Sequence, residues 1–136
     1  MIATALMCMS LNIYHEARGE SLAGQIAVSQ VVMNRVASPR FPDTVCGVVK
    51  QAKYHAWSDI PIRNKCHFSW WCDGLSDKPQ DDEAMLRATI LAQNILEGRI
   101  TNISEGATHY HANYVMPYWA DEMTQVLQIE QHIFYK

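Results

Sequence analysis

The stretch Ile13-Tyr14-His15-Glu16-Ala17-Arg18-Gly19-Glu20-Ser21 decides the fold, because it ends one apolar helix and begins the next. Plotted at about 100° per residue, a helix over residues 1–17 has one apolar stripe, made of Ile2, Ala5, Leu6, Met9 and Ile13. Glu16 falls on this stripe, one turn beyond its last member. A second stripe, made of Met7, Leu11 and Tyr14, lies nearly opposite, so we expect most of the helix to be buried. Gly19 is expected at the C′ position, where a left-handed backbone suits glycine.

A glutamate in this place is expected to have a raised pKa. Partial burial disfavours the charged carboxylate, and the negative end of the helix dipole disfavours it again. A glutamic acid that keeps its proton near neutral pH can act as a general acid. Glu20 lies at the start of the next helix, where the dipole favours negative charge. The alternative is that Glu16 is a helix-end carboxylate paired with Arg18 or Arg35, and periodicity alone leaves both interpretations open.

Length and composition indicate one globular domain over residues 1–136, with 49% apolar and 18% charged residues. The net charge of −3 and the lack of a basic block argue against nucleic acid as the main partner. No run is long enough to span a membrane, and we expect a monomer. No Lys or Arg precedes Arg18, so the positive segment of a signal peptide is missing. We therefore expect cytoplasmic synthesis followed by release, as for phage lysins, or a chain whose signal has been trimmed.

The four cysteines do not indicate a metal site. Cys8 lies within the apolar helix and is expected to be an inert core thiol. Cys46, Cys66 and Cys72 could contain one disulfide, for example between Cys46 and Cys66 or Cys72, or none in a reducing compartment. Their spacing does not match a zinc-finger pattern, so we expect no structural metal and no cofactor.

Apolar residues predict a second central helix over Ser21–Val36, with Ser21 as its N-cap. Its polar exceptions, Gln25, Gln30 and Asn34, will need hydrogen-bond partners if they are buried. Thr44 is expected to cap a short helix that runs to about Gln51.

Residues 52–80 show no sustained period, and long irregular segments of compact domains are often functional. The aromatic side chains of this segment include Trp57, Phe68, Trp70 and Trp71. These side chains could line a carbohydrate groove or form a local core. A third helix is expected to begin at Asp81 or Asp82 and to end before Gly98.

The C-terminal third predicts a small β element. Residues 108–112 alternate as a strand or extended loop does, and residues 126–135 indicate a strand pair or an extended tail. The expected fold class is therefore α+β, a mostly helical domain with a small β element.

Three constellations could carry a function. Glu16 could be a lone general acid and base, with Glu20 as a possible second carboxylate, because glycosidic cleavage often takes two. His109 and His111 could bind zinc together with Glu16 or Asp121, since an HxH on a strand points both imidazoles to one face. The third possibility is a non-catalytic module whose aromatic side chains bind glycans.

Ordered sequence blocks distinguish among these possibilities. They are Glu16-Ala-Arg-Gly-Glu20, Gly24-Gln25, Ala27-Val28, Asn34-Arg35-Val36, Phe41-Pro42, Val45-Cys46-Gly47-Val48-Val49, Phe68-Ser69-Trp70, Ala107-Thr108-His109-Tyr110-His111, Pro117-Tyr118-Trp119 and His132-x-Phe134-Tyr135. In these blocks the chain resembles the cell-wall hydrolase family of the spore cortex-lytic enzyme SleB and its relative CwlJ. The resemblance covers nearly the full length.

The resemblance implies a lysozyme-like α+β domain that cleaves peptidoglycan glycan strands between MurNAc and GlcNAc. It also implies lytic transglycosylase chemistry with one catalytic glutamate, which maps to Glu16. We expect these side chains to bind the sugars: Gln25, Ser69, Trp70, His109, Tyr110 and His111. Two positions depart from the family pattern, with His15 in place of the usual glycine and His67 in place of the usual glutamine. A histidine beside the acid is expected to influence its pKa.

Overall fold

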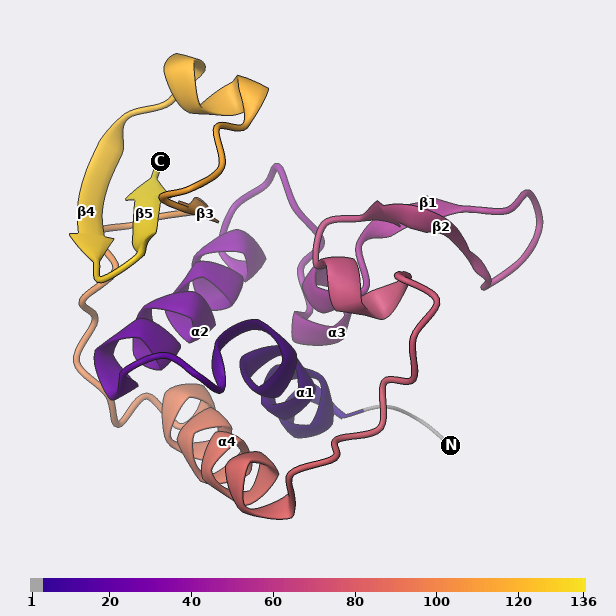
Figure 1. The fold of residues 1–136 in the computed structure, drawn as a ribbon, viewed down its shortest axis with the longest axis horizontal. Coiled ribbons are helices and arrows are strands. Elements are labelled where there is room, and N and C mark those ends of the chain that lie inside the picture. Colours follow the sequence, from indigo (N-terminus) through magenta and orange to yellow (C-terminus); the bar gives the residue numbers. More distant parts are fainter. Residues whose placement is uncertain (1–3) are drawn as a thin grey trace.

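The computed structural model describes residues 4–136 (Figure 1). The expected helix start at Met1 and the place of Ile2 on the apolar stripe lie outside these residues. The helices are α1 (Ala5–Ala17), α2 (Leu22–Val36), α3 (Val45–Val49) and α4 (Asp82–Leu96), with short 3₁₀ helices η1 (Ser69–Trp71) and η2 (Tyr118–Glu122). None of the helices in the described residues is long and apolar enough to span a membrane.

Side-chain caps fix where the four α-helices begin. Thr4, Ser21, Thr44 and Asp81 each accept a hydrogen bond from the backbone N–H three residues later, which satisfies an otherwise unpaired donor. The predictions of Ser21, Thr44 and Asp81 as caps are confirmed. At the end of α4, Gly98 adopts a φ of +72°, the left-handed conformation that favours glycine after a helix.

Helix α1 lies at the centre of the helical part and packs against α2, α3 and α4 (Figure 1). Met9 and Ile13, from the predicted stripe, are fully buried in the main core, as Phe68 and Trp70 nearly are. The second stripe is only partly inside, because Met7 is 41% exposed while Tyr14 is buried. The prediction that α1 is mostly buried therefore holds from Cys8 onward better than at its start, where Ala5 and Met7 are exposed.

The three-stranded sheet packs on the other side of α2 (Figure 1). Its strands are β3 (His109–Ala112), β4 (Gln125–Ile129) and β5 (His132–Tyr135), in the antiparallel order β3-β5-β4. The predicted strand over 108–112 and the C-terminal strand pair are confirmed. A second small core, which includes Val28, Val31 and Phe134, joins α2 to this sheet.

Polar side chains of α2 hold the segment that leads into β3. Gln30 donates to the carbonyl of Thr101 (3.0 Å) and accepts from the amide of Ile103 (2.9 Å). Asn34 donates to the carbonyl of Ala107 at 2.7 Å, and Arg35 Nε donates to the carbonyl of Thr108 at 2.7 Å. These bonds fix the start of β3 against the middle of the helical core.

The segment 52–80 contains a hairpin that the sequence did not predict. Strands β1 (Ala52–Tyr54) and β2 (Pro61–Cys66) pair antiparallel and project away from the helical core, opposite the three-stranded sheet (Figure 1). Trp57 is fully exposed in the connecting loop, whereas Phe68 and Trp70 are buried. The aromatic side chains of this segment are thus divided between a core and a solvent-exposed turn, and they form no single groove.

Two disulfides correct the expectation for the cysteines. Cys8 bonds Cys46, with a Cα–Cα distance of 5.3 Å, and Cys66 bonds Cys72, with 6.1 Å. The prediction of Cys8 as an inert core thiol is wrong, as is the pairing of Cys46 with Cys66 or Cys72. The expectation of one disulfide among Cys46, Cys66 and Cys72 is confirmed by the bond between Cys66 and Cys72. The packing of α3 against α1 brings Cys46 to Cys8, and a single sequence gives no signal of that contact.

The end of α1 also differs from the prediction. Gly19 is not among the residues with positive φ, so it does not adopt the left-handed conformation expected at C′. The chain instead turns through Arg18 in the right-handed region, and the amide of Glu20 donates to the carbonyl of Ala17 at 2.9 Å. This tight turn leads directly into Ser21 and α2.

Candidate active site

Glu16 lies in the last turn of α1 and faces β3. The Tyr110 hydroxyl donates a 2.5 Å hydrogen bond to Glu16 Oε1. Tyr110 packs against both hydrophobic cores, so its ring is fixed between the helices and the sheet. Neither Arg18 nor Arg35 forms an ion pair with Glu16 within residues 4–136: Arg18 donates to the carbonyl of Tyr14.

The pKa of Glu16 is raised, as the sequence predicted, and burial is the main cause. The hydrogen bond from Tyr110 and the nearby charge of Arg35 act in the opposite direction and limit the rise. Burial raises the pKa of Tyr110 well above its ordinary value, so this hydroxyl keeps its proton and remains a donor. Glu16 is therefore a carboxylic acid whose charged form is disfavoured by burial but retains two stabilising neighbours.

A pocket of about 350 Å³ opens beside this pair. Its walls consist of Arg35, His67, His109, Tyr110, Tyr118 and Trp119. Tyr110 thus both lines the pocket and donates its hydroxyl to Glu16, which places the carboxyl group next to the pocket.

His109 lines the pocket between two aromatic rings. Its ring centroid lies 5.0 Å from that of Trp119 and 6.0 Å from that of Phe41. Burial lowers the pKa of His109 to about 4, and the positive charges of Arg35 and His67 contribute to the shift. His109 is therefore neutral near pH 7, and one of its ring nitrogens can donate a hydrogen bond.

His111 is also on β3 but serves a different purpose. It is 8% exposed; its Nδ1 lies 2.7 Å from the carbonyl oxygen of Ala112, and its Nε2 lies 2.8 Å from the Tyr135 hydroxyl. Because a carbonyl only accepts, Nδ1 carries the proton and Nε2 accepts from Tyr135. Both nitrogens are thus engaged within the protein, and in the described residues no three His, Cys, Asp or Glu side chains are grouped as metal ligands.

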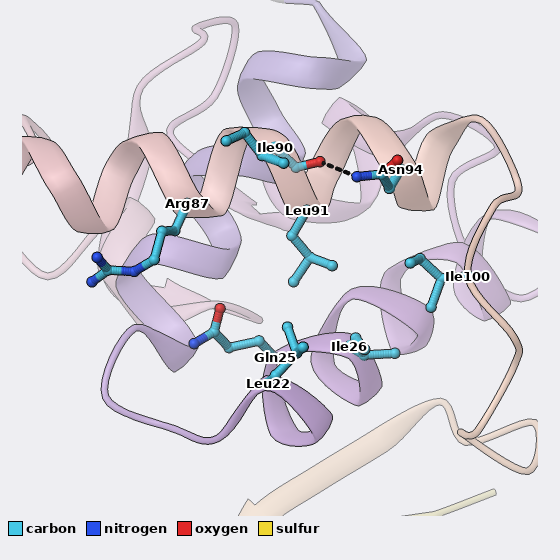
Figure 2. A pocket seen from close by; sticks show the side chains of 8 residues that line it. All are labelled: Leu22, Gln25, Ile26, Arg87, Ile90, Leu91, Asn94 and Ile100. Carbon is cyan, nitrogen blue, oxygen red and sulfur yellow. Dashed lines mark hydrogen bonds between the residues drawn. The ribbon is translucent and has the colours of Figure 1, made fainter.

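Gln25 lies elsewhere, in an apolar pocket of about 470 Å³ between α2 and α4 (Figure 2). Leu22, Ile26, Leu91 and Ile100 supply most of its apolar wall, and Gln25 and Arg87 lie together at one end (Figure 2). The amide of Gln25 donates to the carbonyl of Glu20 at 3.1 Å. This pocket shares no lining residue with the pocket beside Glu16.

Ser69 and Trp70 lie on η1, and neither lines the pocket beside Glu16. Ser69 is exposed, whereas Trp70 is 6% exposed and donates from Nε1 to Asn12 Oδ1 at 2.9 Å. Its ring stacks on His15, with centroids 4.7 Å apart. His15 in turn contacts the carbonyl of Asp77, and it is not among the influences on the pKa of Glu16.

Glu20 immediately precedes the α2 cap Ser21 and points to another part of the sheet. Its Oε1 lies 3.7 Å from Nδ1 of His132 on β5. The His132 ring packs edge-on against Tyr110, with centroids 5.4 Å apart. The two glutamates therefore flank Tyr110, Glu16 through a direct hydrogen bond and Glu20 through His132.

Comparison with known proteins identifies the family of the chain. The family model described as Cell Wall Hydrolase matches residues 19–135. The chain belongs to the cell wall hydrolase family. The matched range begins after Glu16, so the family model does not include this residue.

One similar protein sequence and two similar solved structures indicate what related domains do. A spore cortex-lytic enzyme of Halalkalibacterium halodurans is 33% identical over 130 residues, which are 95% of this chain and 34% of that protein. A catalytic domain described as that of the germination-specific lytic transglycosylase SleB from Bacillus anthracis has a TM-score of 0.72 at 27% identity, covering 100% of this chain and 97% of that one. The SleB catalytic domain of Bacillus cereus has a TM-score of 0.68 at 28% identity, covering 97% and 89%.

The chain spans about a third of the length of the Halalkalibacterium relative and nearly all of the Bacillus anthracis catalytic domain. The mixed helical and β fold is thus that of these catalytic domains, as the resemblance implied.

Four residues of the pocket of this cell wall hydrolase were not predicted as site residues: Arg35, His67, Tyr118 and Trp119. All four are notable in the sequence for other reasons. Arg35, Tyr118 and Trp119 belong to the sequence blocks that resemble the family, and His67 departs from the family pattern. The four residues come from α2, from the loop after β2 and from η2, and a single sequence does not indicate that these segments meet at one cavity.

Proposed function

We propose that this cell wall hydrolase is a lytic transglycosylase domain that cleaves peptidoglycan between MurNAc and GlcNAc, with Glu16 as acid and then base. We also propose that residues 1–136 form one catalytic domain, which acts on the bacterial cell wall as a monomer. The observation that carries the proposal is the buried carboxyl group of Glu16, held by Tyr110 at the wall of a pocket rich in aromatic side chains. The similarity to catalytic domains described as SleB supports the substrate class.

In the first step Glu16 donates its proton to the glycosidic oxygen while the bond from that oxygen to C1 of MurNAc breaks. Because Tyr110 donates to Oε1, the acidic proton is carried by Oε2. The raised pKa keeps this proton available near neutral pH.

In the second step the Glu16 carboxylate takes the proton of the C6 hydroxyl, and O6 bonds to C1 to close a 1,6-anhydro ring. No water is consumed, and Glu16 regains the proton it gave. Between the steps the carboxylate is stabilised by the Tyr110 hydrogen bond and by the charge of Arg35, the two influences that lower its pKa. A single tuned carboxyl group can therefore serve both steps.

The pocket residues are suited to hold a sugar next to Glu16. His109 and Tyr110 offer polar atoms, and Trp119 offers an aromatic face. Gln25, Ser69 and Trp70 lie outside this pocket, so any sugar contacts they make would belong to other parts of an extended glycan. Glu20 is placed to stabilise the start of α2 and to position His132.

Mass spectrometry of the fragments released from purified sacculi tests the proposal. We expect 1,6-anhydroMurNAc ends, about 20 Da lighter than reduced MurNAc ends, because an intramolecular hydroxyl replaces water. EDTA should leave the rate unchanged. Hydrolysed reducing ends, sacculus binding without release of fragments, or loss of activity on chelation with rescue by zinc would each overturn it.

A further inference from the structure

The pocket beside Glu16 has an unusual charge composition. Three of its six lining residues, Arg35, His67 and His109, are basic, and the other three are aromatic. No carboxylate is among the lining residues, and Glu16 is linked to the pocket through its hydrogen bond with Tyr110. A pocket that only bound neutral hydroxyl groups would not require three basic side chains.

Arg35 is a buried cation without a counterion. Its residue is 6% exposed, its Nε is used by the Thr108 carbonyl, and the guanidinium lies over the rings of Phe41 and Phe68. No salt bridge involves it within residues 4–136, and its Nη1 has no hydrogen-bond partner there. While Glu16 holds its proton, the charge of Arg35 is therefore uncompensated, which is costly in a buried position.

We propose that this pocket binds a carboxylate group of the saccharide, through Arg35 together with His67 and His109. The inference rests on the proposed peptidoglycan substrate and defines the chemistry of one sugar position. A carboxylate would supply the counterion that Arg35 lacks, since guanidinium and carboxylate groups form strong charge-assisted hydrogen bonds. Trp119 and the Tyr110 ring would contact the apolar face of the same sugar.

The two histidines lie close enough to Arg35 to be influenced by its charge. Burial is the main cause that lowers the pKa of both, the charge of Arg35 lowers both further, and His67 adds to the lowering at His109. A bound anion would reverse these contributions, so binding should raise the pKa of His109. The charged and titratable groups that face His109 are Arg35 from α2 and His67 from the loop after β2. The rings of Phe41 and Trp119 and the Thr108 hydroxyl also contact it.

Peptidoglycan offers the carboxylate in two places, the lactyl group of MurNAc and the stem peptide attached to it. Three disaccharide probes separate these sources. GlcNAc–MurNAc carries a free lactyl carboxylate, its methyl ester carries none, and GlcNAc–MurNAc bearing an L-Ala–D-Glu dipeptide moves the carboxylates outward. Tighter binding of the free acid than of the other two would identify the lactyl group, and equal or tighter binding of the dipeptide would identify the stem.

The test uses the Glu16→Gln protein, so that the probes are not consumed. Calorimetry should show that at least one carboxylate probe binds about tenfold or more tightly than the ester. NMR titration of His109 should show its pKa rising with that probe and not with the ester. His67→Gln in the same background should reduce the preference severalfold, whereas His55→Gln, in the exposed hairpin, should not.

Equal affinity for acid and ester, an unchanged His109 pKa, or no binding of any probe would overturn the inference. The result is separable from the proposed reaction, because binding is measured in a catalytically inactive protein. Carboxylate selectivity in a chain that releases no anhydro ends would overturn the reaction alone. Anhydro ends without carboxylate selectivity would overturn this inference alone.

Discussion

Tyr110 and Glu16 lie 94 residues apart in sequence and share a 2.5 Å hydrogen bond. This bond joins the last turn of α1 to strand β3, and so joins the helical core to the small sheet. It also holds one oxygen of the carboxyl group in place and leaves the other free to exchange a proton. The position of the Glu16 carboxyl group therefore depends on how the sheet packs against α2.

Removing the hydroxyl in Tyr110→Phe should raise the pKa of Glu16 further, because the hydrogen bond lowers it. A hydrogen bond to a charged group contributes about 1.5–3 kcal/mol, so the alkaline limb of the pH–rate profile should move up by about one to two pH units. Turnover should also fall, since the carboxylate between the two steps loses a donor. Tyr114→Phe, at a 79% exposed tyrosine just beyond β3, is the matched control. An unchanged alkaline limb would refute this role of Tyr110.

The raised pKa of Glu16 predicts a pH-dependent stability difference. A carboxyl group whose pKa is raised in the folded state stabilises the fold below its ordinary value of 4.5, and this contribution is lost as pH rises through the folded pKa. Glu16→Gln retains the acceptor for Tyr110 but does not ionise. Its melting temperature relative to the unmodified chain should therefore increase as the pH is raised above about 4.5. A difference independent of pH would contradict the burial of this group.

The lowered pKa of His109 predicts that folding stability depends on pH in the opposite direction. Its pKa is lowered from 6.5 to about 4 in the folded protein, so its neutral form stabilises the fold above pH 6.5 and stability is lost as pH falls towards 4. NMR titration should give a His109 pKa near 4, and His109→Gln should be less sensitive to acid over this interval. A His109 pKa near 6.5 would show that the imidazole is solvated and lies outside the pocket.

The two disulfides should stabilise the chain unequally. Cys8–Cys46 closes 38 residues and Cys66–Cys72 closes 6. Loop-closure entropy predicts about 4 kcal/mol for the first and about 2 kcal/mol for the second. Denaturant unfolding of the two Cys→Ala pairs should show the larger loss for the Cys8 and Cys46 pair. Equal losses, or no effect of a reductant on the unmodified chain, would contradict this ranking.

Local signals in the sequence were sufficient to predict most of the helices and strands. Capping residues such as Ser21 and Asp81 predict where helices begin, because their side chains accept a hydrogen bond from a backbone N–H in the first turn of the helix. The apolar stripe that ends in Glu16 predicted its burial and the direction of its pKa shift. The β1–β2 hairpin escaped prediction, because its strands are short and largely exposed and lack a clear alternation.

The features that the sequence did not predict depend on contacts between elements that are distant in the sequence. The bond from Cys8 to Cys46 and the position of Arg35 in the pocket both depend on how helices pack, which no single-sequence period encodes. Neighbouring residues on one strand also proved unequal: His109 lines the pocket, while His111 is engaged by Tyr135. Strand alternation predicts that His109 and His111 lie on the same face of β3. It does not predict that His109 contacts Trp119 of η2 while His111 contacts Tyr135 of β5.

The central claim, that Glu16 is the acid and base, is tested most directly by comparing Glu16→Gln with Glu20→Gln on purified sacculi. Both substitutions preserve side-chain size, and melting curves should show both proteins folded. Glu16→Gln should lower the release of anhydro fragments by about 10²–10⁴-fold, the range for lost acid–base catalysis, while sacculus binding persists. Glu20→Gln removes a favourable dipole interaction of about 0.3–1 kcal/mol and should change stability more than rate. A folded Glu20→Gln without activity beside an active Glu16→Gln would reverse the assignment, and activity in both would contradict the single-carboxylate mechanism.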